Sequence, residues 1–119
     1  MPETEADALK NGQTARDLAL GVLDEAETCT LATAAPDGTP EAATVRFVAN
    51  DQYTISINTA TTYRKYENLT ANPRVAIVVD GDRENVQLEG TARELEGPAV
   101  TGVHERYAAK YGQSDYLTN

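Results

Sequence analysis

Hydrophobic and polar residues alternate along much of the middle of the chain. An apolar side chain at every second position is the period of a β-strand with one buried face. Residues 74–79 form an almost continuous apolar run instead, which indicates a buried strand. Turn signals such as Pro36-Asp37-Gly38 separate the stretches and predict tight connections. Five strands are therefore expected, at residues 28–35, 41–49, 53–58, 74–79 and 85–96, the last with a bulge or bend at Gly90.

A helical period of about 3.6 residues recurs in three other places. The first is residues 14–27, where Thr14 is the expected N-cap and Asp17 completes a capping-box-like pair. The second is a short helix with Thr61 or Thr62 as N-cap, stopped by Asn72-Pro73. The third, residues 99–111, is opened by Gly97-Pro98 and ended by Gly112.

This order of elements predicts an antiparallel barrel of the α+β class, with flanking helices and one inserted helix. A parallel fold requires a long crossover after each strand, and the spacing here is too short for that. A chain of 119 residues fits one domain, so residues 1–119 are expected to form a single unit with 1–12 loosely held.

The acidic charge of the chain disfavours several classes of partner. The net charge of −9 and the pI of about 4.4 disfavour a general nucleic-acid binder or an anionic-membrane binder. No apolar run approaches the roughly 20 residues of a membrane span, and the acidic first ten residues do not resemble a secretory signal. One cysteine permits no internal disulfide, which suits a reducing cytoplasm. Abundant acidic residues with three lysines also resemble proteins of salt-loving organisms, a hypothesis that predicts a melting temperature rising with molar salt.

Arg64 and Lys65 pose a question of charge, because they fall in the first turn of the predicted short helix. Cations oppose the positive partial charge of a helix amino terminus unless an anion binds there. Free N–H groups, several hydroxyls and two adjacent cations outline a phosphate site. The alternative is that both side chains are solvated and pair with Glu67, Glu41 or Asp51 on an acidic surface.

Three segments carry a resemblance to a known family. They are LATAAPDGTPEAATVRFVAND, then NTATTYRKYENLTANPRVAIVV, then NVQLEGTAREL. Their order, with Thr-x-x-x-x-Arg-Lys, a short helix, Asn-Pro-x-Val and a strand with a central glycine, resembles the FMN-binding split-barrel family typified by pyridoxamine 5'-phosphate oxidase. The resemblance implies a small antiparallel split β-barrel and a homodimer with two FMN sites at the subunit interface.

The resemblance also implies which residues hold the cofactor. Arg64 and Lys65 match the pair that grips the FMN phosphate, and Asn58 with Thr59 matches the strand end lying along the cofactor. Arg46 and the backbone of Phe47 and Val48 match the segment against the isoalloxazine ring. Asn85 stands where the oxidase has a glutamine. The residues themselves predict no metal site, and no catalytic side chain stands out.

Departures from the family limit what the resemblance implies about activity. The oxidase has a lysine that contacts substrate phosphate, and Asp51 stands at that position here. The oxidase's C-terminal Arg and His segment and the family's additional C-terminal strand are not found, so vitamin B6 oxidation is not implied. The resemblance favours an FMN-dependent oxidoreductase acting on an unknown small molecule. A deazaflavin-coenzyme reductase, a flavin-binding protein without turnover and a haem-binding barrel with His104 as ligand stay open.

Other polar and aromatic residues have ordinary structural explanations. His104 is expected at the surface or rim, because one histidine and one cysteine do not make a metal site. Cys29, on the first strand, is expected in or near the core. Tyr107, Tyr111 and Tyr116 are expected to pack the last helix on the barrel or on a partner, with the lining of a ligand cleft as the alternative.

Overall fold

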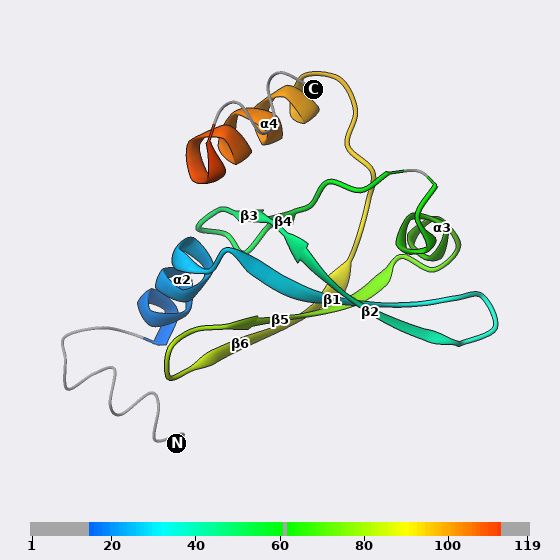
Figure 1. The fold of residues 1–119 in the computed structure, drawn as a ribbon, viewed down its shortest axis with the longest axis horizontal. Coiled ribbons are helices and arrows are strands. Elements are labelled where there is room, and N and C mark those ends of the chain that lie inside the picture. The colour runs from blue at the N-terminus through cyan, green and yellow to red at the C-terminus, as the bar shows by residue number, and fades with distance from the viewer. Residues whose placement is uncertain (1–14, 61, 113–119) are drawn as a thin grey trace.

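The computed structural model describes residues 15–60 and 62–112, which form three helices and two antiparallel sheets (Figure 1). The larger sheet has the strand order β2-β1-β5-β6, and β3 pairs with β4. The α+β class and the antiparallel strands of the split-barrel fold are confirmed, and the four-stranded sheet is open, with β2 and β6 at its edges. The elements are α2 (Ala15–Glu25), β1 (Thr28–Ala34), β2 (Pro40–Arg46), β3 (Val48–Ala49), β4 (Ile55–Ser56), α3 (Arg64–Ala71), β5 (Arg74–Asp80), β6 (Asn85–Thr91) and α4 (Pro98–Tyr111).

The main core lies between α2 and one face of the larger sheet. Alternate residues of β1 point inward, and the register of β1 with β2 and β5 places their apolar residues in the same layer. The buried members of this core are Val22, Leu23, Cys29, Leu31, Val45, Phe47, Ile77 and Val79. The period-two pattern thus predicts the buried face of the sheet correctly.

The predicted hairpin between the first two strands is confirmed. The side chain of Asp37 accepts a hydrogen bond from the backbone N–H of Thr39 at 2.9 Å, and the backbone of Ala35 bonds both Gly38 and Thr39. Gly38 has a φ of +90°, a conformation that side chains rarely adopt. These local bonds lower the pKa of the Asp37 carboxyl below its usual value.

Two of the predicted strands are shorter or broken in the structure. The continuous strand at 41–49 was wrong, because the chain leaves the larger sheet after Arg46 and enters the smaller one at Val48. Phe47, between them, is fully buried, and its backbone bonds Tyr111 of α4 instead of a neighbouring strand. The strand expected at 53–58 is reduced to Ile55–Ser56.

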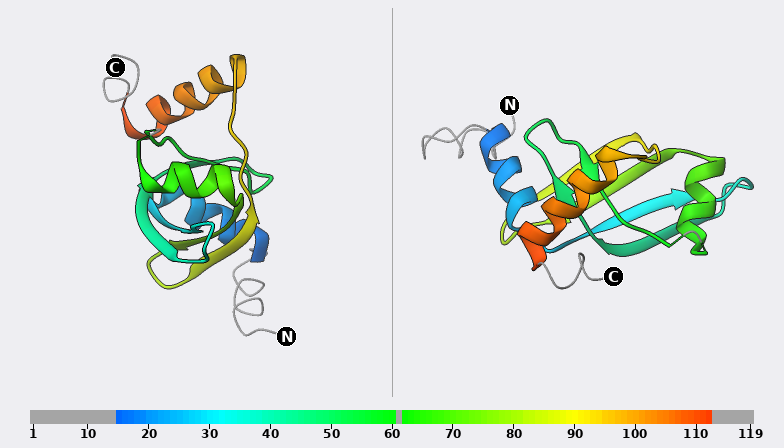
Figure 2. Two further views of the ribbon diagram at one scale, coloured as in Figure 1. Left: turned by 90° about the vertical axis from the view of Figure 1, so that its right-hand side faces the viewer. Right: turned by 90° about the horizontal axis from the view of Figure 1, so that it is seen from above.

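The last strand also differs from expectation. It ends at Thr91 rather than at 96, and Gly90 faces Val75 in an unbroken one-to-one register, so the bulge at Gly90 was wrong. The residues beyond Thr91 leave the sheet because they lead to α4, which lies beyond the β3–β4 pair from the larger sheet (Figures 1 and 2).

The helices agree with the predicted pattern apart from their ends. α2 ends at Glu25 instead of Glu27, and its expected N-cap Thr14 is outside the described residues, as are residues 1–12 and Tyr116. α4 spans the predicted residues with Pro98 in its first turn and Gly112 as C-cap. It packs through its own small apolar cluster of Val48, Val103 and Tyr107. α2 and α3 lie at opposite ends of the larger sheet (Figure 1).

Candidate functional site

The amino end of α3 begins one residue later than the sequence predicts. The N-cap is Tyr63, in an extended conformation, because the Tyr63 carbonyl is the first to accept helical bonds, from the N–H groups of Tyr66 and Glu67. The expectation of Thr62 as N-cap was wrong, and Thr61 is outside the described residues. The Tyr63 side chain makes no capping hydrogen bond, so the first turn of α3 has no side-chain acceptor from its N-cap.

Arg64 and Lys65 occupy this first turn, as the sequence predicts. The Arg64 side chain is 69% exposed, and its Nε lies 3.8 Å from Oε2 of Glu41 on β2. The Lys65 ammonium lies 4.4 Å from the centre of the Tyr63 ring, and Tyr63 itself is 54% exposed. An exposed ion pair at this distance contributes little, so both cations remain accessible to an anion at the end of the helix.

A buried polar contact holds α3 against the sheet. Asn68 is the buried residue of α3, and its amide donates a hydrogen bond of 3.0 Å to the hydroxyl of Thr33 on β1. Both side chains are at most 5% exposed. Asn68 lies one turn after Arg64, so this bond fixes the position of the first turn of α3, which carries the two cations, relative to β1.

Asn58 and Thr59 lie in the segment that leads from β4 into α3. The backbone N–H of Asn58 donates to the hydroxyl of Tyr107 at 3.2 Å, and the Thr59 hydroxyl donates to the carbonyl of Ala60 at 3.4 Å. Asn58 is exposed and Thr59 is half-buried. The structure therefore places both residues next to α3, on a segment anchored by α4.

Arg46, Phe47 and Val48 form the crossing between the two sheets. The Arg46 guanidinium lies 5.0 Å from the centre of the Tyr111 ring. The Phe47 N–H donates to the Tyr111 hydroxyl at 3.0 Å, and the Phe47 carbonyl accepts from that hydroxyl at 2.7 Å. Val48 pairs with Ser56 of β4. The Phe47 backbone groups predicted to face a flavin ring are thus bonded to α4 in this chain.

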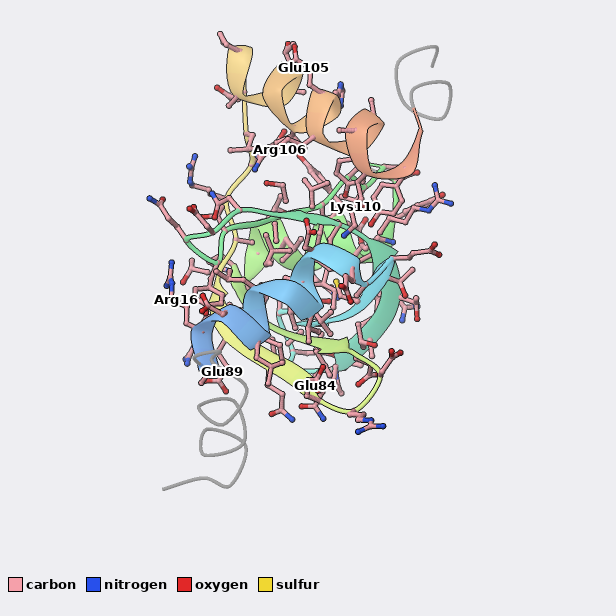
Figure 3. The ribbon with its side chains drawn as sticks, turned by 90° about the vertical axis from the view of Figure 1, so that its left-hand side faces the viewer. Arg16, Glu84, Glu89, Glu105, Arg106 and Lys110 are labelled. Atoms are coloured by element: carbon pink, nitrogen blue, oxygen red, sulfur yellow. The ribbon has the colours of Figure 1, made fainter. Side chains whose placement is uncertain are left out.

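Lys110 adds a cation to the same crossing. Its ammonium lies 3.9 Å from the centre of the Phe47 ring and donates to the carbonyls of Phe47 and Leu23. Figure 3 shows its side chain reaching from α4 toward the body of the domain. Partial burial lowers the pKa of Lys110 below its usual value, and nearby Asp24 opposes that change.

Asn85 lies far from the cations of α3 within one chain. It is the first residue of β6 and pairs with Asp80, whereas Arg74, the residue of β5 nearest to α3, pairs with Thr91. The seven residues of β5 separate the two ends by roughly 20 Å. The structure brings together Asn58, Thr59, Arg64 and Lys65 along one segment, and Asn85 is not among them.

Carboxylates and the histidine lie elsewhere. A groove of about 290 Å³ between α2 and the β5–β6 turn is lined by acidic residues that disfavour an anionic cofactor: Asp17, Glu25, Asp80, Asp82 and Glu84. Within residues 15–60 and 62–112, no group of three or more His, Cys, Asp or Glu side chains is placed to hold a metal ion. His104 is half-buried on α4. In the same described ranges, no helix is long and apolar enough to cross a bilayer.

Cys29 lies in the core, as expected, and is 3% exposed. Burial raises the pKa of its thiol to about 11, and the charge of Lys110 only partly offsets this. Because the thiolate is the reactive form, we expect iodoacetamide at pH 8 to modify the native protein about a hundredfold more slowly than the protein in urea. Mass spectrometry measures this directly, since the chain has one cysteine. Equal rates in both conditions would show that Cys29 is accessible.

The sequence does not indicate how α4 contacts the crossing between the two sheets. Tyr107 and Tyr111 were expected to pack the helix, and their spacing of four residues places them on one helix face. Their hydroxyls also bond the backbone of Arg46, Phe47 and Asn58. Nothing in the local sequence indicates which backbone groups these hydroxyls reach.

Comparison with known proteins places the chain in a family. The family profile described as pyridoxamine 5'-phosphate oxidase matches residues 16–119. The chain belongs to the pyridoxamine 5'-phosphate oxidase family. No curated protein matches it significantly.

Solved structures similar to this chain carry different descriptions. Rv2991 of Mycobacterium tuberculosis, a conserved hypothetical protein, is 28% identical, with a TM-score of 0.72 over 85% of this chain and 66% of that one. An F420 reductase is 26% identical, with a TM-score of 0.60 over 73% and 74% of the two chains. HutZ of Vibrio cholerae, described as a haem storage protein, is 22% identical, with a TM-score of 0.69 over 80% and 74%. The chain spans two thirds to three quarters of these proteins, and the likeness to HutZ shows the fold alone.

Proposed function

We propose that the protein binds FMN and is an oxidoreductase acting on a small molecule as a homodimer. The observation that carries this proposal is the pair Arg64 and Lys65 on the uncapped first turn of α3. A phosphate group there would receive backbone N–H, guanidinium and ammonium donors together, and its charge would offset the repulsion between the two cations and the helix end.

Asn58, Thr59 and Arg46 would serve the other parts of the cofactor, whereas the Phe47 backbone groups are already bonded to Tyr111. Asn58 and Thr59 follow the same segment, and the Thr59 hydroxyl adds a polar group beside α3. Arg46 lies five residues along β2 from Glu41, the neighbour of Arg64, so the backbone of Arg46 is roughly 17 Å from that of Glu41. Positive charge at the ring end stabilises a reduced, anionic flavin. Bound FMN would supply hydride or single-electron transfer, and the protein would supply binding and orientation.

The homodimer accounts for the place of Asn85. Since β5 separates Asn85 from α3 within one chain, Asn85 would serve the cofactor site of the other copy in the proposed dimer. A second copy would also cover the exposed edges of the open sheet at β2 and β6.

The similarity to the F420 reductase favours a second candidate, a reductase that uses this deazaflavin coenzyme. A flavin-binding protein without turnover would use the same residues. Haem binding ranks lower, because His104 is the one histidine of the sequence and the likeness to HutZ is limited to the fold. The acidic charge of −9 continues to disfavour nucleic acid, and the lone thiol suits a cytoplasmic location.

The test is the visible absorbance spectrum of the purified protein, recorded before and after addition of FMN and gel filtration. We expect flavin bands that elute with a peak of dimer size. A deazaflavin or haem band in place of flavin would replace the cofactor and keep the fold. No retained chromophore after incubation with each of the three would overturn the proposal of a cofactor site.

A further inference from the structure

One buried hydroxyl joins the two parts of the proposed cofactor site. Tyr107 of α4 is 1% exposed, and its hydroxyl lies 2.9 Å from the carbonyl oxygen of Arg46 and 3.1 Å from that of Ser56. The same oxygen accepts a hydrogen bond of 3.2 Å from the N–H of Asn58. A tyrosine hydroxyl has one proton and two lone pairs, so its proton is shared between the two carbonyls while the oxygen accepts from Asn58.

These partners come from separate parts of the fold. Arg46 ends β2 in the larger sheet, whereas Ser56 ends β4 in the smaller one, and Asn58 continues from β4 toward α3. Tyr107 is 49 to 61 residues away from them in sequence. Its hydroxyl therefore sets the separation between the end of β2 and the start of the segment that leads to Arg64.

Tyr111 reinforces the same arrangement from the next turn of α4. The centre of its ring lies 5.6 Å from that of the Tyr107 ring, and the Arg46 guanidinium lies over the Tyr111 ring in a cation–π contact. Arg46 is thus held twice, by its carbonyl on Tyr107 and by its side chain on Tyr111. The hydrogen bond to Ser56 is buried and those to Arg46 and Asn58 are partly buried, so backbone groups deprived of the Tyr107 hydroxyl would lose stabilisation unless β2 and the β4 segment moved toward water.

We propose that Tyr107 is a positioning residue for the cofactor, through which α4 holds Arg46 at the ring end in fixed relation to Asn58 and Thr59. This inference rests on the proposed function, because it concerns the same cofactor site. The alternative is that Tyr107 serves only to pack α4 against the domain and does not affect the cofactor site. Tyr107→Phe separates the two, since phenylalanine keeps the buried ring and removes only the hydroxyl.

The experiment compares Tyr107→Phe with two controls. Ile77→Val removes one methyl group from the buried part of β5 and lowers stability without touching α4, and Tyr53→Phe removes a hydroxyl whose contact with the Arg16 carbonyl is exposed and long, at 3.5 Å. Thermal unfolding curves of the wild type and of each variant identify a temperature at which all of them are folded. There, the dissociation constants for FMN and for riboflavin, which lacks the phosphate, are measured by quenching of flavin fluorescence.

We expect Tyr107→Phe to weaken both ligands about tenfold, because the ring end is misplaced for each of them, whereas both controls stay within twofold of the wild type. FMN and riboflavin affinities within twofold of the wild type in folded Tyr107→Phe would overturn the positioning role and leave the proposed function standing. A wild-type protein that binds neither ligand would overturn the proposed function and the positioning role with it.

Should Tyr107→Phe fail to fold, amide hydrogen exchange of the wild type supplies the second measurement. We expect the Asn58 amide to be protected, and FMN to slow its exchange further together with that of Phe47. An Asn58 amide that exchanges at the same rate with and without bound FMN would overturn the proposal.

Discussion

Replacing both Arg64 and Lys65 with alanine is expected to lower the affinity for FMN by about a hundredfold or more and to leave the affinity for riboflavin unchanged. A hydrogen bond from a charged group contributes about 1.5–3 kcal/mol, and each 1.4 kcal/mol is about a factor of ten. Both side chains project from the first turn of α3, where, among the residues that the structure describes, Arg64 has a long contact with Glu41 and Lys65 lies over Tyr63. Titration with each flavin, followed by fluorescence, measures the effect.

The phosphate is what distinguishes the two flavins, so their comparison isolates the phosphate contact from any general damage. Arg83→Ala is the control for the loss of an exposed cation, because Arg83 is exposed in the β5–β6 turn at the other end of the sheet from α3. Its FMN affinity should equal that of the wild type. An equal loss for FMN and riboflavin would mean that the double variant disturbs the ring end, and an unchanged FMN affinity would disprove the phosphate assignment.

Phe47→Ala is expected to lower the free energy of unfolding by about 3–5 kcal/mol, the usual cost of removing a large buried aromatic side chain. Phe47 is fully buried in the main core at the point where the chain passes from the larger sheet to the smaller one. Its ring also lies 3.9 Å from the Lys110 ammonium. Such a loss is a large part of the roughly 5–15 kcal/mol that stabilises a domain. Urea unfolding followed by circular dichroism measures it.

Tyr63→Ala is the control for this stability measurement, because Tyr63 is also aromatic but is 54% exposed. Its substitution should change the free energy of unfolding by no more than about 0.5 kcal/mol, as for most surface positions. A loss below about 1 kcal/mol for Phe47→Ala would show that the crossing is not part of the cooperative core.

The position of the two cations of α3 depends on how this helix is held against the sheet. α3 has eight residues, and its buried residue is the polar Asn68. The buried hydrogen bond between Asn68 and Thr33 therefore holds α3 against β1. A helix of this length is marginal in isolation, and most of its stability comes from tertiary contacts. The position of a phosphate site on α3 therefore depends on a contact between residues 35 positions apart.

Local patterns were sufficient to predict much of this protein. The alternation along 28–35 predicts a strand and its buried face, because side chains of a strand alternate between two faces whatever surrounds them, and the apolar run at 74–79 predicts a buried strand. The turn at Asp37-Gly38 and the limits of α4 at Pro98 and Gly112 follow from backbone conformations that few residues adopt. The placement of Arg64 and Lys65 in the first turn of α3 likewise needs only the helical period and Asn72-Pro73.

Contacts between distant segments could not be predicted in this way. The sequence at 41–49 predicts one continuous strand, yet the strand breaks at Phe47, whose backbone N–H and carbonyl are both bonded to the Tyr111 hydroxyl. Gly90 continues a regular ladder, since its partner Val75 determines the register and the glycine does not. The separation of Asn85 from α3, and the link from Tyr107 to Arg46 and Asn58, likewise arise from packing. Hydroxyls and backbone groups carry no periodic signal along the chain, so their partners become definite only when the elements come together.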